Sequence, residues 1–162
     1  MSRLDSFIRR LLAQRATIDH AAKLVAALPG PVLELGLGNG RTYDHLRERL
    51  KGREIFVFDR ELAAHPSSRP DAGHFIEGDF RDTLPRALKR LGAKAVLAHC
   101  DIGSHSPEAS RALAAEIAPL LAPLMASGAL VLGDQPMPHP AWRALELPGE
   151  LEPGRYFMYR VE

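Results

Sequence analysis

The sequence predicts an α/β fold in which a mostly parallel sheet carries helices on both faces and ends in an antiparallel hairpin. Short apolar runs of strand length alternate with segments of helical apolar spacing along most of the chain. A glycine or a polar residue closes each run, as at the ligand-binding edge of open α/β sheets. The last two strand candidates lie too close in sequence for a helical crossover, so we expect them to pair as a hairpin.

Five strands are expected where an apolar run stops at glycine or a polar residue, namely residues 32–35, 55–58, 74–77, 95–98 and 129–132. Two more candidates, residues 142–147 and 156–161, bring the sheet to seven strands. The segment between them, residues 148–154, is rich in glycine and proline and suits a turn. One strand of this hairpin must run antiparallel, and we expect it at the edge of the sheet.

Apolar residues at helical spacing predict one long helix or two short helices over residues 4–28, ended by Pro29. Further helices are expected at residues 42–50, about 84–91 and 106–125. Ser106 is a candidate N-cap, and Pro107 suits the first helical position.

The chain has 162 residues, 46% hydrophobic and 25% charged, which suits one globular domain. We divide it into a helical cap at residues 1–28 and a core at residues 31–162. The net charge of +1 argues against broad binding to nucleic acid or to an anionic membrane. Cys100 is the only cysteine, the N-terminus lacks an apolar signal core, and no apolar run reaches the roughly 18 residues that span a bilayer. We therefore expect a cytoplasmic protein without membrane or nucleic-acid partners.

The strongest motif is the glycine loop, Glu34 to Gly40, with the sequence ELGLGNG between the first strand and the next helix. Its glycines permit a sharp turn and a close approach of the backbone to a ligand. The following helix N-terminus offers free N–H groups to a phosphate or a carboxylate. Dinucleotide-binding loops require GxGxxG, whereas this loop has GxGxG and Arg41 at the third glycine's place. A carboxylate beside free N–H groups suits a zwitterionic amino acid attached to a sulfonium better than a pyrophosphate.

In this loop and in the order of the motifs that follow, the chain resembles the class I S-adenosyl-L-methionine-dependent methyltransferase family. The resemblance implies a Rossmann-like class I methyltransferase fold, S-adenosyl-L-methionine (SAM) as cofactor and S-adenosyl-L-homocysteine (SAH) as product. It implies that Asp59 binds the ribose hydroxyls, that Asp79 and Phe80 meet the adenine, and that the segment from His99 to Asp101 faces the methyl group and the acceptor. The implied cofactor-binding residues are Glu34, Gly36, Gly38, Asn39, Gly40, Asp59, Arg60, Gly78, Asp79, Phe80 and His99.

Methyl transfer from a sulfonium is an in-line displacement in which the enzyme mainly positions the nucleophile and excludes water. A base is needed only where the acceptor must first lose a proton. The candidate catalytic residues are Asp101, at the end of the fourth strand, and His105, in the loop after it. On the N-terminal helix, Gln14 or Arg15 could bind the cofactor carboxylate or an acidic acceptor. The small chain has little room for a recognition domain, so we expect a small-molecule acceptor.

A divalent-cation site is an alternative role for the same strand ends. Asp101 ends one strand, and Asp134 and Gln135 end its expected neighbour, so two carboxylates and an amide could hold Mg²⁺. This arrangement is similar to that of catechol-type O-methyltransferases, in which the metal binds and acidifies a hydroxyl acceptor. That family has Asp-Asn at the second position, whereas this chain has Asp-Gln, whose amide reaches differently.

The chain departs from the family pattern between the fifth strand and the hairpin, where the family has a substantial helix. Only residues 135–141 are available, and three prolines disfavour a regular helix there. The open side and the exposed hairpin edge favour self-association, so we expect a homo-oligomer. Three other functions stay open: a non-catalytic SAM-binding protein, a nicotinamide-dependent oxidoreductase and a nucleic-acid methyltransferase. The glycine spacing disfavours the oxidoreductase, and the lack of an N/D-P-P-Y/F motif after the fourth strand disfavours the nucleic-acid enzyme.

Overall fold

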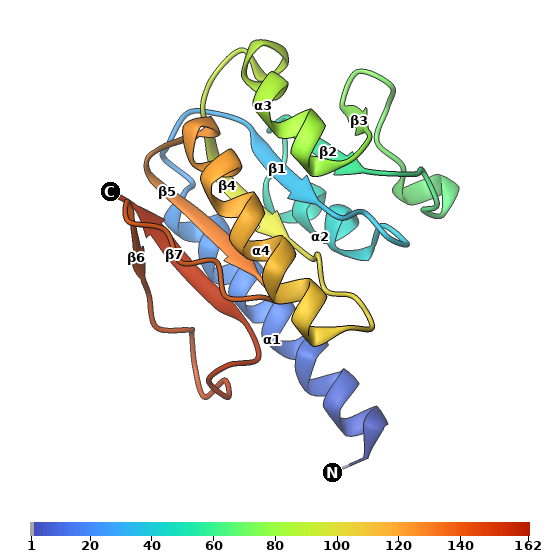
Figure 1. Ribbon diagram of the computed structural model, residues 1–162, viewed down its shortest axis with the longest axis vertical. Helices are drawn as coiled ribbons and strands as arrows, with labels where there is room; N and C mark the ends of the chain where they lie inside the picture. Colours follow the sequence, from blue (N-terminus) through green and yellow to red (C-terminus); the bar gives the residue numbers. More distant parts are fainter. Residues whose placement is uncertain (1) are drawn as a thin grey trace.

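A computed structural model describes residues 2–162, in which one sheet lies between two layers of helices (Figure 1). The sheet of this part of the chain has seven strands in the order β3-β2-β1-β4-β5-β7-β6. The strands are β1 (Val32–Leu35), β2 (Ile55–Asp59), β3 (Phe75–Glu77), β4 (Ala95–Cys100), β5 (Met125–Gly133), β6 (Trp142–Ala144) and β7 (Phe157–Val161). The α-helices are α1 (Arg3–Leu24), α2 (Arg41–Arg49), α3 (Phe80–Leu91) and α4 (Pro107–Leu121), and 3-10 turns cover Pro66–Ser68 and Ala122–Leu124.

The first five strands run parallel, with β1 between β2 and β4. Helices cover both faces of these strands, so their apolar runs need no alternation, and all four residues of β1 are buried. Parallel neighbours end at the same edge of a sheet. The glycine loop after β1, Asp101 after β4 and Asp134 after β5 therefore lie at one edge, which we call the carboxyl edge.

One prediction for the C-terminal hairpin is wrong. The antiparallel strand is not at the edge, because β7 lies between β5 and β6 and the short β6 forms the edge. β7 buries Met158 in the core of one helical layer and Tyr159 in that of the other, which requires a place inside the sheet. Of the three residues of β6 only Trp142 is buried, so this strand suits an edge, and it ends at Ala144 rather than Leu147.

The helices begin at capping residues. α1 is one long helix that starts with a capping box, in which Ser2 and Asp5 bind each other's backbone N–H groups. α4 starts as predicted, with the Ser106 side chain as its N-cap. α3 starts at Phe80 rather than near residue 84, because the Asp79 carboxylate caps it by accepting the N–H of Arg81 at 2.9 Å.

Two hydrophobic clusters join the layers. One packs α3 and α4 against one face of the sheet through residues such as Leu84 and Ile117, and the other packs α1 and α2 against the opposite face through Ile18 and Leu46. The proline-rich residues 135–141 form no helix, as predicted. No helix within residues 2–162 is long and apolar enough to cross a membrane.

Candidate functional site

The glycine loop turns between β1 and α2 through three residues with positive φ: Gly36 at 87°, Gly38 at 51° and Gly40 at 85°. A β-carbon on Gly36 would collide with the backbone oxygen of Asp101, and one on Gly40 would lie 2.7 Å from the backbone oxygen of Ser68. A β-carbon on Gly38 would meet nothing within 4 Å. The fold therefore requires glycine at the first and third positions, whereas the second borders open space.

That open space is a cavity of about 290 Å³, which we call the loop cavity. The glycine loop, the start of α2, the N-terminal half of α1 and the chain after β4 line it. Two side chains of α1 bind the Asp101 carboxylate there: Gln14 Nε2 donates to Oδ2 at 3.2 Å, and an Arg10 guanidinium nitrogen lies 3.5 Å from Oδ1. Among the predicted residues, Gly36, Gly38 and Asn39 meet Asp101 at this cavity.

Asp59 reaches the glycine loop from the end of the neighbouring strand β2. Its Oδ2 accepts the N–H groups of Leu37 at 2.7 Å and of Gly38 at 3.2 Å. The N–H groups of Gly36 and Gly40 donate to backbone carbonyls. Acceptors of the fold itself therefore use the N–H groups of these four loop residues. At the N-terminus of the following helix, where free N–H groups are expected, that of Arg41 donates to Asn39 Oδ1 at 3.4 Å.

Glu34 and His99 are fully buried beneath the loop, although we expected both to face the cofactor. The Glu34 carboxylate accepts the Thr42 hydroxyl of α2 and lies 2.6 Å from Nδ1 of His99. The other ring nitrogen of His99 is hydrogen-bonded to the Tyr156 hydroxyl at the start of β7. The buried triad of Glu34, His99 and Tyr156 thus ties together β1, β4 and the C-terminal hairpin, and Thr42 adds α2.

Burial and the neighbouring charges shift the pKa values of the triad. Burial raises the pKa of Glu34, against the opposing effect of His99. Burial alone would lower the pKa of His99, but Glu34 and, after it, the charges of Asp101 and Asp134 together raise it. The pKa of Tyr156 rises well above its usual value through burial and then through the charge of Asp101, so this hydroxyl keeps its proton.

Asp79 lies at the carboxyl end of β3, next to the end of β2. It binds the backbone N–H of Arg81 and forms an ion pair of 2.5 Å with Arg60. These two contacts, in that order, lower the pKa of Asp79 from 3.8 to about 2. Gly78 precedes it with a φ of 138°, and Phe80 follows it half-buried as the first residue of α3. This group lies outside the loop cavity, at the strand ends where the resemblance implies the nucleoside.

The Asp134 carboxylate holds the chain that follows β4. Its Oδ1 accepts the N–H of Ile102 at 3.1 Å, its Oδ2 accepts that of Gly103 at 2.9 Å, and the Gln135 amide donates to it at 3.4 Å. Burial and then the charge of Asp101 raise its pKa. The Arg10 guanidinium lies at Asp101, and the Gln135 amide turns its nitrogen rather than its oxygen toward Asp134, so this arrangement does not form the oxygen ligand set of a divalent cation. Within residues 2–162, no three His, Cys, Asp or Glu side chains form a group that could hold a metal ion.

Two further candidates lie away from the loop cavity: His105 is exposed in the loop before α4, and Arg15 is exposed on α1. Arg10 and Tyr156 were not among the residues predicted for the site. Helical spacing could have found Arg10, because it precedes Gln14 by one turn of the same helix. Tyr156 gives no local signal, since its partner His99 is 57 positions away.

A profile of the family described as S-adenosyl-L-methionine methyltransferase matches residues 1–161 of the chain. No curated protein sequence gives a significant match. The crystal structure of an S-adenosyl-L-methionine methyl transferase from Silicibacter pomeroyi DSS-3 is 48% identical, with a TM-score of 0.95 over 100% of this chain and 99% of that chain.

Two more distant structures share the fold. An rRNA methylase from Streptococcus thermophilus is 13% identical, with a TM-score of 0.57 over 89% of this chain and 93% of that one. The sugar N-methyltransferase KedS8 from a Streptoalloteichus species is 19% identical, with a TM-score of 0.52 over 81% of this chain and 55% of that one. At these identities the likeness concerns the fold and not the molecule that is acted on.

Proposed function

The chain belongs to the S-adenosyl-L-methionine methyltransferase family, and from this membership we propose that it transfers the methyl group of SAM to a small-molecule acceptor at the carboxyl edge. The predicted enzyme class and Rossmann-like fold are confirmed by the same matches. The observation that carries the proposal is the loop cavity, which brings the glycine loop, Asp101 and α1 together.

The loop cavity supports binding of the amino-acid end of SAM. Four N–H groups of the glycine loop are occupied within the fold, so we assign the SAM carboxylate to Arg10 and Gln14 on the opposite wall, which have N–H groups beyond those that bind Asp101. The nucleoside then extends toward the ends of β2 and β3, where Asp59 and Asp79 lie. Glu34 and His99, being fully buried, act beneath the loop as residues that position it.

Bound SAM supplies a methyl carbon on a positively charged sulfur. The acceptor nucleophile bonds to this carbon in line with the carbon–sulfur bond, which breaks and leaves SAH. Asp101 is the acidic side chain that lines the loop cavity, and Arg10 and Gln14 hold its carboxylate in place. We assign Asp101 the tasks of orienting the acceptor and accepting its proton where one is lost. His105, in the following loop, stays a prediction as a second catalytic residue.

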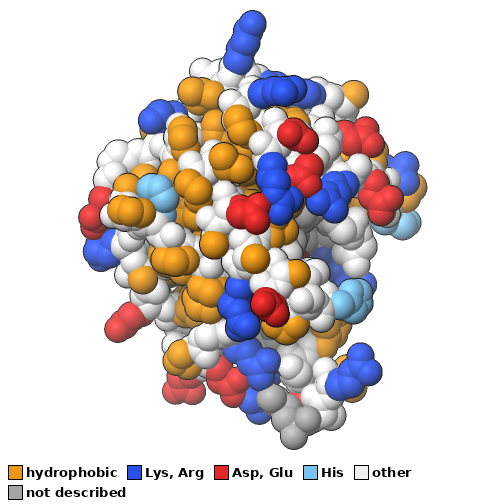
Figure 2. Space-filling model, in the orientation of Figure 1, with side chains coloured by type: hydrophobic (Ala, Val, Ile, Leu, Met, Phe, Trp, Pro, Cys, Tyr) orange, Lys and Arg blue, Asp and Glu red, His pale blue; other side chains and the backbone are white. Residues whose placement is uncertain are grey.

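Charge supports a small acceptor. The net charge is +1, and Figure 2 shows Lys and Arg side chains interleaved with Asp and Glu on the face that carries α4. A protein that binds nucleic acid broadly instead concentrates Lys and Arg in a patch or stripe. RNA is nevertheless the acceptor to test against, since a structure of similar fold is an rRNA methylase.

The proposal is tested with SAM that carries tritium in its methyl group, offered with separate pools of small metabolites and of RNA. We expect label in the small-molecule pool and a turnover about 100-fold lower for Asp101→Asn, which keeps SAH binding. Asp82→Asn, at an exposed aspartate of α3, is the matched control and should react like the wild type. Label confined to RNA would contradict the small acceptor, and label in neither pool would favour the non-catalytic alternative.

Self-association is the second part of the proposal. The side chains of Leu4, Phe7, Ile8 and Leu12 are 43–65% exposed and follow helical spacing along α1, which makes one apolar stripe. The edge strand β6 adds unpaired backbone groups. A second copy that covered the stripe would remove this apolar surface from water.

A further inference from the structure

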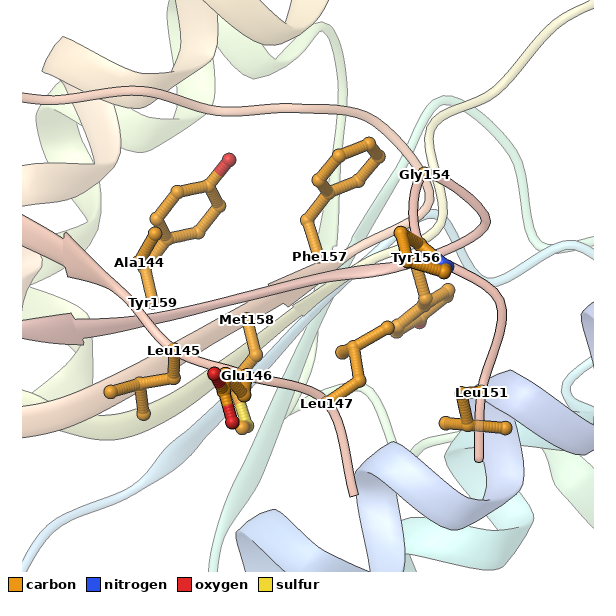
Figure 3. Close-up of a pocket in the computed structure, with 11 residues that line it drawn as sticks. Ala144, Leu145, Glu146, Leu147, Leu151, Gly154, Tyr156, Phe157, Met158 and Tyr159 are labelled. Carbon is orange, nitrogen blue, oxygen red and sulfur yellow. The ribbon is translucent and has the colours of Figure 1, made fainter. Parts of the chain in front are cut away.

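A second cavity, of about 420 Å³, lies beside the C-terminal hairpin (Figure 3). We call it the hairpin cavity. The long connection between β6 and β7 forms part of its wall with Leu145, Leu147 and Leu151, and β7 contributes Met158. Figure 3 shows Leu145, Leu147 and Met158 on one side of β7, with α1 close to Leu151.

The position of this cavity follows from the topology. β6 runs in the same direction as β5, and β7 runs back, so the connection between them crosses the carboxyl edge. Ligands bind at this edge in open α/β sheets. The hairpin cavity is therefore on the same edge of the sheet as the glycine loop and Asp101.

The cavity wall is apolar and only partly covered. Leu145, Leu147 and Leu151 are half-buried, yet all three line the same hollow. A cavity of this volume with a mostly apolar lining is typical of small-molecule sites. Protein interiors are close-packed, so a cavity of this size is not expected as a mere gap in the core. Binding of an apolar ligand would be favourable here, because it removes apolar surface of both the ligand and the cavity wall from water.

The charge of the lining limits the class of ligand. Glu146 is its one charged side chain among the described residues, and it is exposed. A carboxylate there disfavours phosphate and carboxylate ligands and tolerates neutral or basic ones. This argues against nucleotides as occupants.

Tyr156 links the hairpin cavity to the loop cavity. Its side chain lines the hairpin cavity, while its hydroxyl is hydrogen-bonded to His99 of the buried triad. Gln14, whose side chain lowers the pKa of the same hydroxyl slightly, lines the loop cavity. Tyr156 and Gln14 thus lie between the two cavities.

We propose that the hairpin cavity holds the apolar part of the methyl acceptor, which is a largely apolar small molecule without anionic groups. The proposal rests on the proposed function and names the substrate class for it. The nucleophilic atom of the acceptor then lies at the end of the molecule that faces the carboxyl edge, where Asp101 and the methyl group are.

The test uses N-phenyl-1-naphthylamine, an uncharged apolar dye that fluoresces when it leaves water. We expect saturable binding to the full chain and binding about tenfold weaker in Leu147→Ser, because the variant loses apolar contact. Leu145→Ser is a second variant with the same expected effect. Leu88→Ser, at a leucine of α3 that is 43% exposed, is the matched control and should bind the dye like the wild type. No dye binding, or equal binding by all four proteins, would overturn the proposal.

Titration with SAH separates this proposal from the proposed function. Leu147→Ser should bind SAH like the wild type, and saturating SAH should leave the dye bound. Displacement of the dye by SAH would place the dye in the loop cavity and overturn the acceptor assignment alone. Failure of the wild type to bind SAH would contradict the proposed function itself and, with it, the assignment that rests on it.

Discussion

The Glu34 carboxylate has no exposed surface, and Thr42 and His99 bind its two oxygens inside the protein. A buried charge pair of this kind gains little over apolar packing while both partners are present. Loss of one partner is costly, since it leaves the other charge buried and unpaired. The triad lies directly below the glycine loop, so we expect its integrity to matter for the stability of the site.

Replacing Glu34 therefore tests the triad at the level of single residues. We expect Glu34→Ala to lower the free energy of unfolding by about 3–5 kcal/mol, because His99 is left without its charged partner. Tyr156→Phe keeps the ring and removes one hydrogen bond, so it should cost only about 1 kcal/mol. Urea denaturation followed by circular dichroism measures both, and equal losses in the two variants would contradict the account.

Asp79 gives a prediction for acid stability. Its pKa falls from 3.8 to about 2 on folding, so its ionised form stabilises the native state fully above about pH 4. This contribution is lost as the pH falls through the native pKa of about 2. Wild type should be more stable than Asp79→Asn at about pH 5, and the difference should shrink toward about pH 2. A difference in unfolding free energy that stays constant over this range would show that the carboxylate does not contribute in this way.

Single residues could be placed from the sequence, but their partners could not. Parallel strands end at one edge, so the positions of Asp59 and Asp101 at the carboxyl edge followed from the strand pattern. The partner of Glu34 is His99, 65 positions away, and strand periodicity carries no information about such a contact. Asp59 likewise accepts the N–H groups of Leu37 and Gly38, and the loop motif alone does not indicate these contacts.

At the scale of elements, α1 forms a wall of the loop cavity. Gln14 is buried at this wall, whereas its neighbour Arg15 points outward and is exposed. We expect Gln14→Ala to weaken SAH binding about tenfold, the equivalent of one hydrogen bond to a charged group. Arg15→Ala is the matched control on the same helix and should leave the affinity unchanged. If Gln14→Ala binds SAH like the wild type in calorimetry, Gln14 has no part in the cofactor site.

Elements were predictable where a local signal decides them. The five parallel strands, the start of α4 at Ser106 and the lack of a helix in residues 135–141 all follow from nearby sequence. The predicted start of α3 near residue 84 is wrong, because the helix begins after its N-cap Asp79 and contains Pro85. The order of β7 and β6 depends on burial across the whole sheet, which a hairpin signal does not contain.

At the scale of the whole molecule, α1 projects beyond the sheet at its N-terminal end (Figure 1) and carries the exposed apolar stripe there. We expect light scattering at micromolar concentration to give a mass above the 17.8 kDa of one chain. Ile8→Glu, within the stripe, should lower that mass to 17.8 kDa, whereas Leu24→Glu, at an exposed leucine near the other end of α1, should not. A wild-type mass of 17.8 kDa would contradict self-association.

The central claim is that the space beside Gly38 is the SAM site, and a calorimetric titration with SAH tests it most directly. Gly38 and Gly52 both have positive φ, and a β-carbon added to either would meet no atom within 4 Å, but only Gly38 lines the loop cavity. Gly38→Arg and Gly52→Arg therefore impose similar backbone strain, but only the arginine at position 38 would occupy the loop cavity. The account predicts that the wild type and Gly52→Arg bind SAH with micromolar affinity and that Gly38→Arg does not. Equal SAH binding by Gly38→Arg, or no binding by folded wild type freed of co-purified ligand, would contradict it.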